Sequence, residues 1–166
     1  MPTDTASYHP MLSRTDRLAA ASGDFLILCG RILLAWVFIQ SAWRKLGNMP
    51  AFIKTSLIER GVPSAYADSL GYIAAPLEFV AGVCILLGFA TRHAALAIFA
   101  FTIVATLIGH RYWEFSGPAH QMQLTQFWKN VSMMGGQMLL FVTAGGRFSA
   151  DALLRRKVAA HPPALA

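Results

Sequence analysis

Two ionisable residues stand inside long apolar stretches of this chain. Arg31 interrupts the stretch FLILCGRILLAWVFIQSAW, and Glu78 lies near the middle of LGYIAAPLEFVAGVCILLGF. A charge near the centre of a bilayer costs about 2.5–3.5 kcal/mol on insertion scales. Such side chains are therefore expected to face protein, and an ionisable pair inside a membrane is by default a candidate functional site.

Arg31 and Glu78 are expected to pair with each other. If neighbouring spans run antiparallel with aligned centres, Arg31 lies about 4–5 Å from its span centre at the rise of a helix, and Glu78 lies near the centre of its own. The long arginine side chain can bridge this gap. Two roles stay open: the pair could fix helix register without any activity, as buried ions do elsewhere, or it could take part in chemistry.

His110 ends a stripe of polar residues in a third apolar stretch. Thr102, Thr106 and His110 follow one another at four-residue spacing, which places them on one helical face. Histidine changes charge near neutral pH, so His110 is a candidate for proton exchange. The alternative is a histidine that is hydrated at the membrane interface.

The stretch QFWKNVSMMGGQMLLF, residues 126–141, carries Lys129 and Asn130 close to its start. Lys129 shares a helical face with Ser132, and Asn130 lies on the adjacent stripe with Gln137. Polar and small residues on such stripes indicate a face turned toward other helices. The alternative for Lys129 is a side chain that reaches out to the lipid headgroups.

Membrane-spanning helices must position these groups. The chain is 55% hydrophobic and only 13% charged, whereas soluble domains carry about 25% charged residues. A spanning helix needs about 20 mostly apolar residues. Four stretches qualify, at about residues 25–43, 70–89, 94–112 and 126–144. They predict an all-α membrane protein, a four-transmembrane-helix up-down bundle.

The segments outside the spans also have predicted places. MPAFIKTSLIERGVP, in the first outer loop, predicts a short amphipathic helix that lies on the membrane. Lys and Arg are slightly more numerous beside the two tails and the link at Arg92, so the positive-inside rule puts both termini in the cytoplasm. We expect a cytoplasmic tail over residues 1–23, a transmembrane domain over 24–146 and a basic cytoplasmic tail over 147–166.

Several other classes of protein do not fit. The formal net charge of +6 sits between and beyond the apolar stretches, which suits anionic headgroups and not nucleic acid. Cys29 and Cys84 form neither a CxxC pair nor zinc spacing. They fall at similar depths, so their proximity stays open. We expect no metal site, no haem and no other intrinsic cofactor, and any redox chemistry would need a diffusible quinone or a partner.

The chain resembles the DoxX family of small four-helix membrane proteins. The resemblance rests on GRILLAWVFIQSAWRKLGN, PLEFVAGVCILLGFATR, GHRYW and QFWKNVSMMGGQMLLF. It implies a multi-pass protein of the bacterial inner (plasma) membrane, often labelled an oxidoreductase, with relatives in quinone-linked thiosulfate oxidation and in oxidative-stress complexes. The motif residues that the resemblance implies here are Arg31, Glu78, His110, Lys129 and Asn130.

The sequence thus predicts a membrane oxidoreductase subunit with a polar intramembrane pocket for quinone or an oxidised sulfur species. Glu78 and His110 would exchange protons as catalytic residues. The residues expected to bind the substrate are Arg31, Lys129, Asn130 and Gln137. The alternative is a non-catalytic membrane anchor or assembly subunit of a redox or stress-response complex. Lipid and a protein partner are expected contacts, nucleic acid is not, and oligomerisation stays open.

Overall fold

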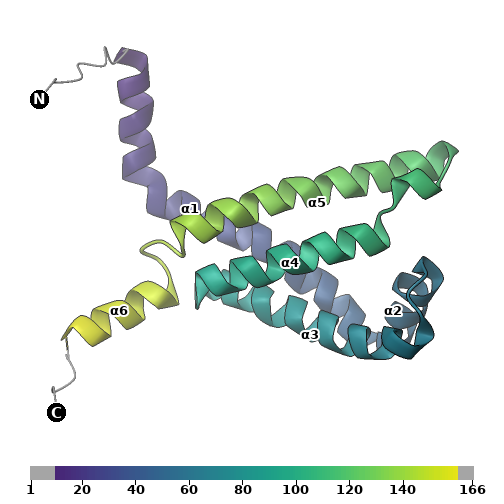
Figure 1. The fold of residues 1–166 in the computed structure, drawn as a ribbon. Coiled ribbons are helices and arrows are strands. Elements are labelled where there is room, and N and C mark those ends of the chain that lie inside the picture. The colour runs from purple at the N-terminus through teal and green to yellow at the C-terminus, as the bar shows by residue number, and fades with distance from the viewer. Residues whose placement is uncertain (1–9, 161–166) are drawn as a thin grey trace, which may run out of the picture.

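The computed structural model describes residues 10–160 and contains helices but no strand in that range. The helices, in chain order, are α1 (Pro10–Gly47), α2 (Met49–Ser56), the 3₁₀ helix η1 (Ile58–Arg60), α3 (Ser64–Leu87), α4 (Thr91–Gly109), the 3₁₀ helix η2 (Tyr112–Glu114), α5 (Gly117–Thr143) and α6 (Ala150–Ala160) (Figure 1). Residues 1–9 and 161–166 of the predicted tails lie outside the described range.

Three helical segments of the described chain are long and apolar enough to cross a membrane: Ser13–Gly47, Ser64–Leu87 and Thr91–Glu114. They contain the first three predicted spans. The first is longer than predicted, because the charged residues Arg44 and Lys45 continue the helix instead of ending it. The fourth predicted span falls in α5, whose first half is rich in Gln, Lys and Asn and lowers its hydropathy.

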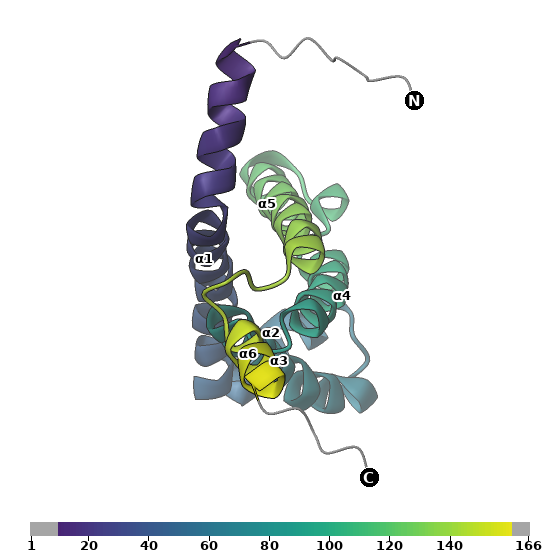
Figure 2. The same cartoon turned by 90° about the vertical axis from the view of Figure 1, so that its left-hand side faces the viewer.

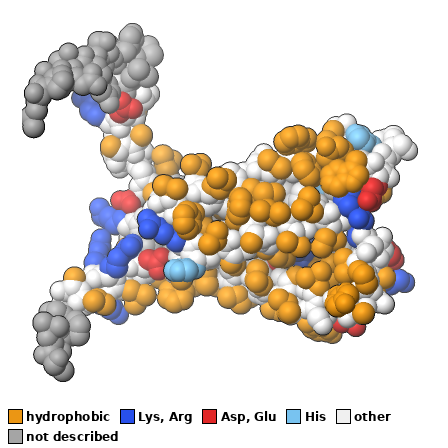
Figure 3. All heavy atoms as spheres, viewed as in Figure 1, with side chains coloured by type: hydrophobic (Ala, Val, Ile, Leu, Met, Phe, Trp, Pro, Cys, Tyr) orange, Lys and Arg blue, Asp and Glu red, His pale blue; other side chains and the backbone are white. Residues whose placement is uncertain are grey.

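The long helices pack in the order of the chain. α1 packs along α3, α3 along α4 and α4 along α5, whereas α1 and α5 meet less extensively (Figures 1 and 2). We call the end of the bundle that carries α6 the terminal end, and the end that carries α2, η1 and η2 the loop end. Hydrophobic side chains cover the middle of the molecule, while Lys and Arg gather toward its ends (Figure 3). This distribution matches a surface that faces lipid between two polar interfaces.

The helical spacing of small residues around Glu78 predicts that this face of α3 packs against protein, and the structure buries it. Gly71, Ala75, Glu78, Ala81 and Gly82 all lie inside the structure. A Cβ atom added at Gly82 would come within 3.0 Å of a side-chain carbon of Ile39 on α1. Small residues thus let α1 and α3 approach closely, as in other membrane helix pairs.

The predicted amphipathic helix forms, and part of its apolar face packs against α3. Asn48 caps α2 by accepting a hydrogen bond from the Ala51 amide at 3.2 Å. Met49, Ile53 and Leu57 are buried in one cluster with Ala67 and Ala75 of α3. The helix is therefore attached to the bundle, and its location at the membrane surface stays a prediction.

Gly82→Leu should destabilise the bundle. The new side chain would collide with Ile39, including its backbone nitrogen 3.4 Å from the added Cβ, and overpacking costs about 1–3 kcal/mol. Thermal unfolding in mild detergent measures the effect. The control is Gly135→Leu on α5, where an added Cβ meets nothing within 4 Å. Equal midpoints for the two variants would contradict close packing at Gly82.

Candidate functional site

Arg31 ties three segments together at the terminal end. Its side chain is buried, with 2% exposed. Nη1 donates hydrogen bonds to the carbonyl oxygens of Gly145 at 2.5 Å and Phe148 at 3.0 Å, and Nη2 donates to that of Leu86 at 3.0 Å. Leu86 lies in the last turn of α3, where free carbonyl groups favour a positive charge. Arg31 therefore fixes α1, the end of α3 and the link between α5 and α6.

Asp151 completes this end of the bundle by capping α4 from a different helix. Its carboxylate accepts hydrogen bonds from the amides of Ala90 at 2.7 Å and Thr91 at 2.9 Å, and from the Thr91 hydroxyl at 2.8 Å. Partial burial acts to raise the pKa of Asp151, but the hydrogen bonds from Thr91 and Ala90 outweigh it, so the pKa lies below its ordinary value. The charged form is thus the one that the fold holds.

The predicted pair of Arg31 and Glu78 is wrong. The antiparallel register of α1 and α3 brings Leu86 next to Arg31, and Glu78 lies eight residues earlier, about 12 Å away along the helix axis. The prediction aligned the centres of two apolar stretches. That alignment failed because α1 extends well beyond its apolar stretch in both directions.

Glu78 pairs instead with Lys45. The Lys45 ammonium and a Glu78 carboxylate oxygen are 2.5 Å apart. Glu78 is 2% exposed and the Lys45 side chain is 22% exposed. The ammonium also lies 5.3 Å from the ring centre of Phe52 and 5.2 Å from that of Phe101, so aromatic faces add to its stabilisation. The sequence interpretation missed Lys45 because the adjacent charges of Arg44 and Lys45 resemble the start of a loop.

A cavity of about 590 Å³ opens beside Lys45 between α1, α2, α3 and α4. Its walls are mostly aliphatic and aromatic, with few polar groups. The polar lining residues are Ser41, Lys45, Ser56, Arg60 and His110; the larger apolar ones are Phe52, Leu57, Leu70, Ile73, Leu77, Phe101, Val104 and Ile108. The arrangement can hold an apolar ring and offer one cationic donor from the wall.

His110 lies at the loop end, where α4 stops. Its Nδ1 is 2.9 Å from the side-chain oxygen of the buried Gln123. Because an amide oxygen only accepts, Nδ1 donates this bond, which makes Nε2 the acceptor of the neutral ring. His110 lines the cavity beside Lys45 and also a second cavity between α1 and α5. Its role in proton exchange stays a prediction.

Asn130 and Gln137 face α4, as their stripe predicts. The Asn130 amide donates to the Thr106 hydroxyl at 2.8 Å, and the Gln137 amide donates to the Thr102 hydroxyl at 3.0 Å. Both threonines are buried. These bonds pair the amide nitrogens of Asn130 and Gln137 within the protein, while the buried side-chain oxygen of Gln137 has no hydrogen-bond partner among the described residues. Their predicted part in substrate binding is untested, since each side chain already joins two helices.

Lys129 is exposed and lines the second cavity together with Arg44, His110 and Asn130. Glu78 is not among the residues that line this cavity. The structure therefore separates two of the predicted site residues, with Glu78 on the α3 side of α1 and Lys129 on its α5 side.

Cys29 and Cys84 are free and half-buried. Within residues 10–160, no three His, Cys, Asp or Glu side chains are grouped so that they could hold a metal ion.

Three apolar candidate spans with buried charged and amide groups between them define a multi-pass helical membrane protein. The sequence profile of the DoxX family matches residues 26–111, and the chain belongs to that family.

Two of the relatives are inner membrane proteins of similar length. Inner membrane protein YphA of Escherichia coli K12 is 32% identical over 131 residues, which cover 79% of this chain and 91% of YphA. Inner membrane protein YqjF of the same organism is 33% identical over 134 residues, covering 81% and 95%. The ER-derived vesicles protein ERV29 of Saccharomyces cerevisiae is 20% identical over 127 residues, which cover 76% of this chain but 33% of ERV29. No solved structure matches. The chain is thus a DoxX-family inner-membrane protein.

Asp151→Asn should weaken the terminal end in a pH-dependent way. The folded pKa of Asp151 lies below its ordinary value of 3.8, so the carboxylate stabilises the fold above that value and loses this effect as the pH falls through the folded pKa. The variant should therefore melt roughly 2–4 °C below the native protein at pH 7, and the difference should shrink below about pH 4.

Thermal melts of the detergent-purified protein across this pH range provide the measurement. Asp68→Asn, at an exposed position of α3, is the matched control. A gap that stays constant from pH 7 to pH 3 would argue against the charged cap.

Proposed function

We propose that this protein is the quinone-binding membrane subunit of an oxidoreductase, with the quinone in the cavity beside Lys45 and Glu78. One observation carries the proposal: the partly buried ammonium of Lys45, paired with the buried carboxylate of Glu78, lines a largely apolar cavity. An ion pair inside a membrane is costly unless it is used or well satisfied.

The size and lining of the cavity support an aromatic carbonyl compound. Its volume of about 590 Å³ falls within the range of about 300–1,000 Å³ that is usual for ligand sites. Phe52 and Phe101 flank Lys45 and suit a planar ring. The aliphatic walls favour a quinone over a small oxidised sulfur species, which would need more polar contacts than they offer.

Lys45 and Glu78 supply the chemistry that a quinone requires from its site. A quinone carries two electrons and two protons when it is reduced, and the electrons would come from a partner protein. The Lys45 ammonium has three donors, so one can bind Glu78 while another holds a carbonyl oxygen and stabilises negative charge on it. Glu78 can exchange a proton with Lys45, and His110 lies where α4 ends and can pass protons to water.

We also propose that α5 is a fourth span and that both termini lie in the cytoplasm. α5 has 27 residues, about 40 Å of helix, which exceeds a hydrocarbon core of about 30 Å. Two of its polar side chains, Asn130 and Gln137, bond to α4 instead of meeting lipid. The terminal end also carries the basic run Arg155, Arg156 and Lys157 of α6, which favours the cytoplasmic side.

A second candidate is a non-catalytic assembly subunit of a redox or stress-response complex. The observation that favours it is α6, which projects from the bundle (Figure 1) and exposes Leu153, Leu154 and Val158. An exposed apolar face of this kind suits a protein partner. Here the Lys45–Glu78 pair would only hold α1 against α3.

Removing the charges of the Lys45–Glu78 pair should weaken quinone binding without unfolding the protein. The double variant Lys45→Gln/Glu78→Gln keeps two side chains that can bond to each other but removes the ammonium. Loss of a charged hydrogen bond should weaken binding by about 10-fold or more. Equilibrium dialysis of a short-chain ubiquinone or menaquinone against the detergent-purified protein measures it, with unfolding melts as the check on folding.

The matched control is Lys54→Gln/Glu59→Gln, which removes two exposed charges at the same end. A native protein that binds no quinone, or a double variant that binds as tightly, would reject the redox role. If the double variant instead loses a co-purifying protein, the assembly role gains support.

The topology predicts opposite outcomes for two reporter fusions. Alkaline phosphatase fused after Glu114 should be active, because three spans place that point outside the cytoplasm. The same enzyme fused after Ala166 should be inactive, while green fluorescent protein there should fluoresce. Equal alkaline phosphatase activity at both points would show that α5 does not cross the membrane.

A further inference from the structure

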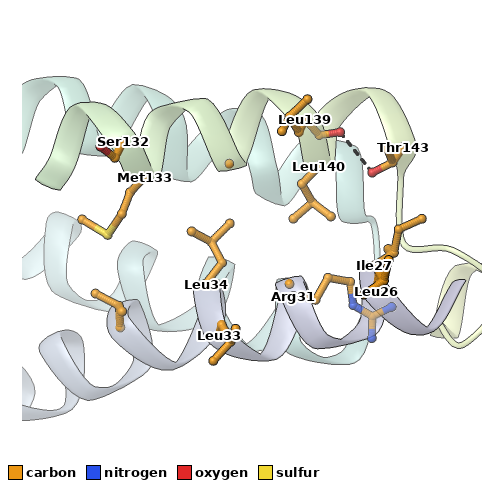
Figure 4. Close-up of a pocket in the computed structure, with 13 residues that line it drawn as sticks. Leu26, Ile27, Arg31, Leu33, Leu34, Ser132, Met133, Leu139, Leu140 and Thr143 are labelled. Carbon is orange, nitrogen blue, oxygen red and sulfur yellow. Dashed lines mark hydrogen bonds between the residues drawn. The ribbon is translucent and has the colours of Figure 1, made fainter. Parts of the chain in front are cut away.

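A groove runs between α1 and α5, which contact each other less extensively than the other neighbouring long helices do. Figure 4 shows the part of the groove toward the terminal end. It consists of two adjoining cavities, of about 590 Å³ toward the terminal end and about 930 Å³ toward the loop end. Val37, Ser132 and Met133 line both, so the two cavities adjoin one another along the helices.

The part toward the terminal end is apolar and owes its space to glycine. Figure 4 shows Leu34 and Met133 reaching into it from facing helices. A Cβ added at Gly30 would meet nothing within 4 Å, and one added at Gly136 would meet only Leu34, at 3.8 Å. The exposed side chains Leu33 and Leu139 form part of its lining. This space suits a hydrocarbon chain.

The part toward the loop end is polar and cationic. Arg44 lines it from α1 and Lys129 from α5, and Gln40, Gln126 and Asn130 stand nearby. None of the described residues that line this part is acidic. Neither Arg44 nor Lys129 forms an ion pair with a described residue. Glu78 attracts Arg44 only at a distance beyond that of an ion pair, and two such cations on facing helices attract an anion.

The dimensions match one leaflet of a bilayer. Lys129 and Thr143 line opposite ends of the groove, and their 14-residue separation is about 21 Å at the rise of a helix. Half of a hydrocarbon core is about 15 Å, which leaves room for a headgroup beyond the chain.

We propose that this groove binds one anionic phospholipid from the surrounding membrane. Its phosphate lies between Arg44 and Lys129, and one acyl chain follows the apolar part past Gly136. The lipid fills the gap between α1 and α5 and joins the two helices that the protein itself joins least. A quinone would leave both cations without a counter-charge. A symmetric second copy would bring the same cations against them.

The binding site is tested by titrating the full-length detergent-purified chain with phosphatidylglycerol or phosphatidylethanolamine and counting bound lipids by native mass spectrometry. Phosphatidylglycerol should bind more tightly. Arg44→Gln and Lys129→Gln should each weaken it about fivefold and together about 25-fold, since each cation contributes about 1 kcal/mol to binding an anionic lipid. Lys54→Gln, at an exposed position outside the groove, should bind normally.

Two glycine variants separate the chain site from the headgroup site. Gly136→Leu fills the groove and should reduce binding of both lipids, whereas Gly135→Leu, where an added Cβ meets nothing within 4 Å, should not. Equal affinity for the two lipids, or unchanged affinity in the Arg44→Gln/Lys129→Gln variant, overturns the proposal. So does a dimer that Gly136→Leu disrupts.

The proposed lipid site can be tested independently of the proposed quinone site. Lys45→Gln/Glu78→Gln should leave phosphatidylglycerol binding unchanged. Melting without added lipid should be unchanged in the Arg44→Gln/Lys129→Gln variant, because both side chains are exposed.

Discussion

The bundle depends on how it satisfies the guanidinium of Arg31. A buried cation is tolerated only when hydrogen bonds replace its water. Here three carbonyl oxygens accept hydrogen bonds from the two Nη atoms, while the buried Nε has no partner among the described residues. The close packing around Arg31 leaves no room for a side chain at two neighbouring positions. A Cβ at Gly88 would lie 2.5 Å from Arg31 Nη1, and one at Gly145 would lie 2.7 Å from the Thr91 hydroxyl oxygen. Gly88 also has a φ of 67°, which glycine adopts without strain. The turn between α3 and α4 and the end of α5 can close only around this arginine.

Fixing Arg31 beside Leu86 also sets the opposite end of the bundle. α1 and α3 are antiparallel, so moving away from Arg31 on α1 and from Leu86 on α3 leads toward the same end of the bundle. Lys45, about 21 Å from Arg31 along α1, reaches Glu78, about 12 Å from Leu86 along α3, with its long side chain. The two buried charges of these helices are thus satisfied in different ways: Arg31 by backbone carbonyls and Glu78 by an ammonium. The first contact closes the fold, while the second lies next to a cavity and remains open to a ligand.

The sequence patterns predicted the positions of the helices better than they predicted the contacts between the helices. Apolar stretches of spanning length and the small residues of α3 predicted where helices lie and which face is buried, because both depend on local composition. Helix register depends instead on where each helix ends, and Arg44 and Lys45 looked like an end when they were still helical. α2 showed the same limit: its amphipathic pattern was real, but the pattern is the same for a helix on lipid and for one on α3. Asn130 and Gln137 faced inward as expected, yet their threonine partners already occupy them.

α1 borders two cavities that favour ligands of different charge, and Ser41 and His110 line both of them. Toward α3 and α4, the ammonium of Lys45 is neutralised by Glu78 inside apolar walls, so a bound molecule gains from being neutral until it takes up electrons. Toward α5, Arg44 and Lys129 have no acidic neighbour along the groove, so an anion gains from the outset. Salt screens the attraction within a partly buried pair only weakly. It largely screens the attraction of an exposed cation for an anion more than about 10 Å away at 0.1 M salt. The same helix can therefore hold a neutral ring on one side and an anionic lipid on the other, because charge pairing distinguishes the two sides.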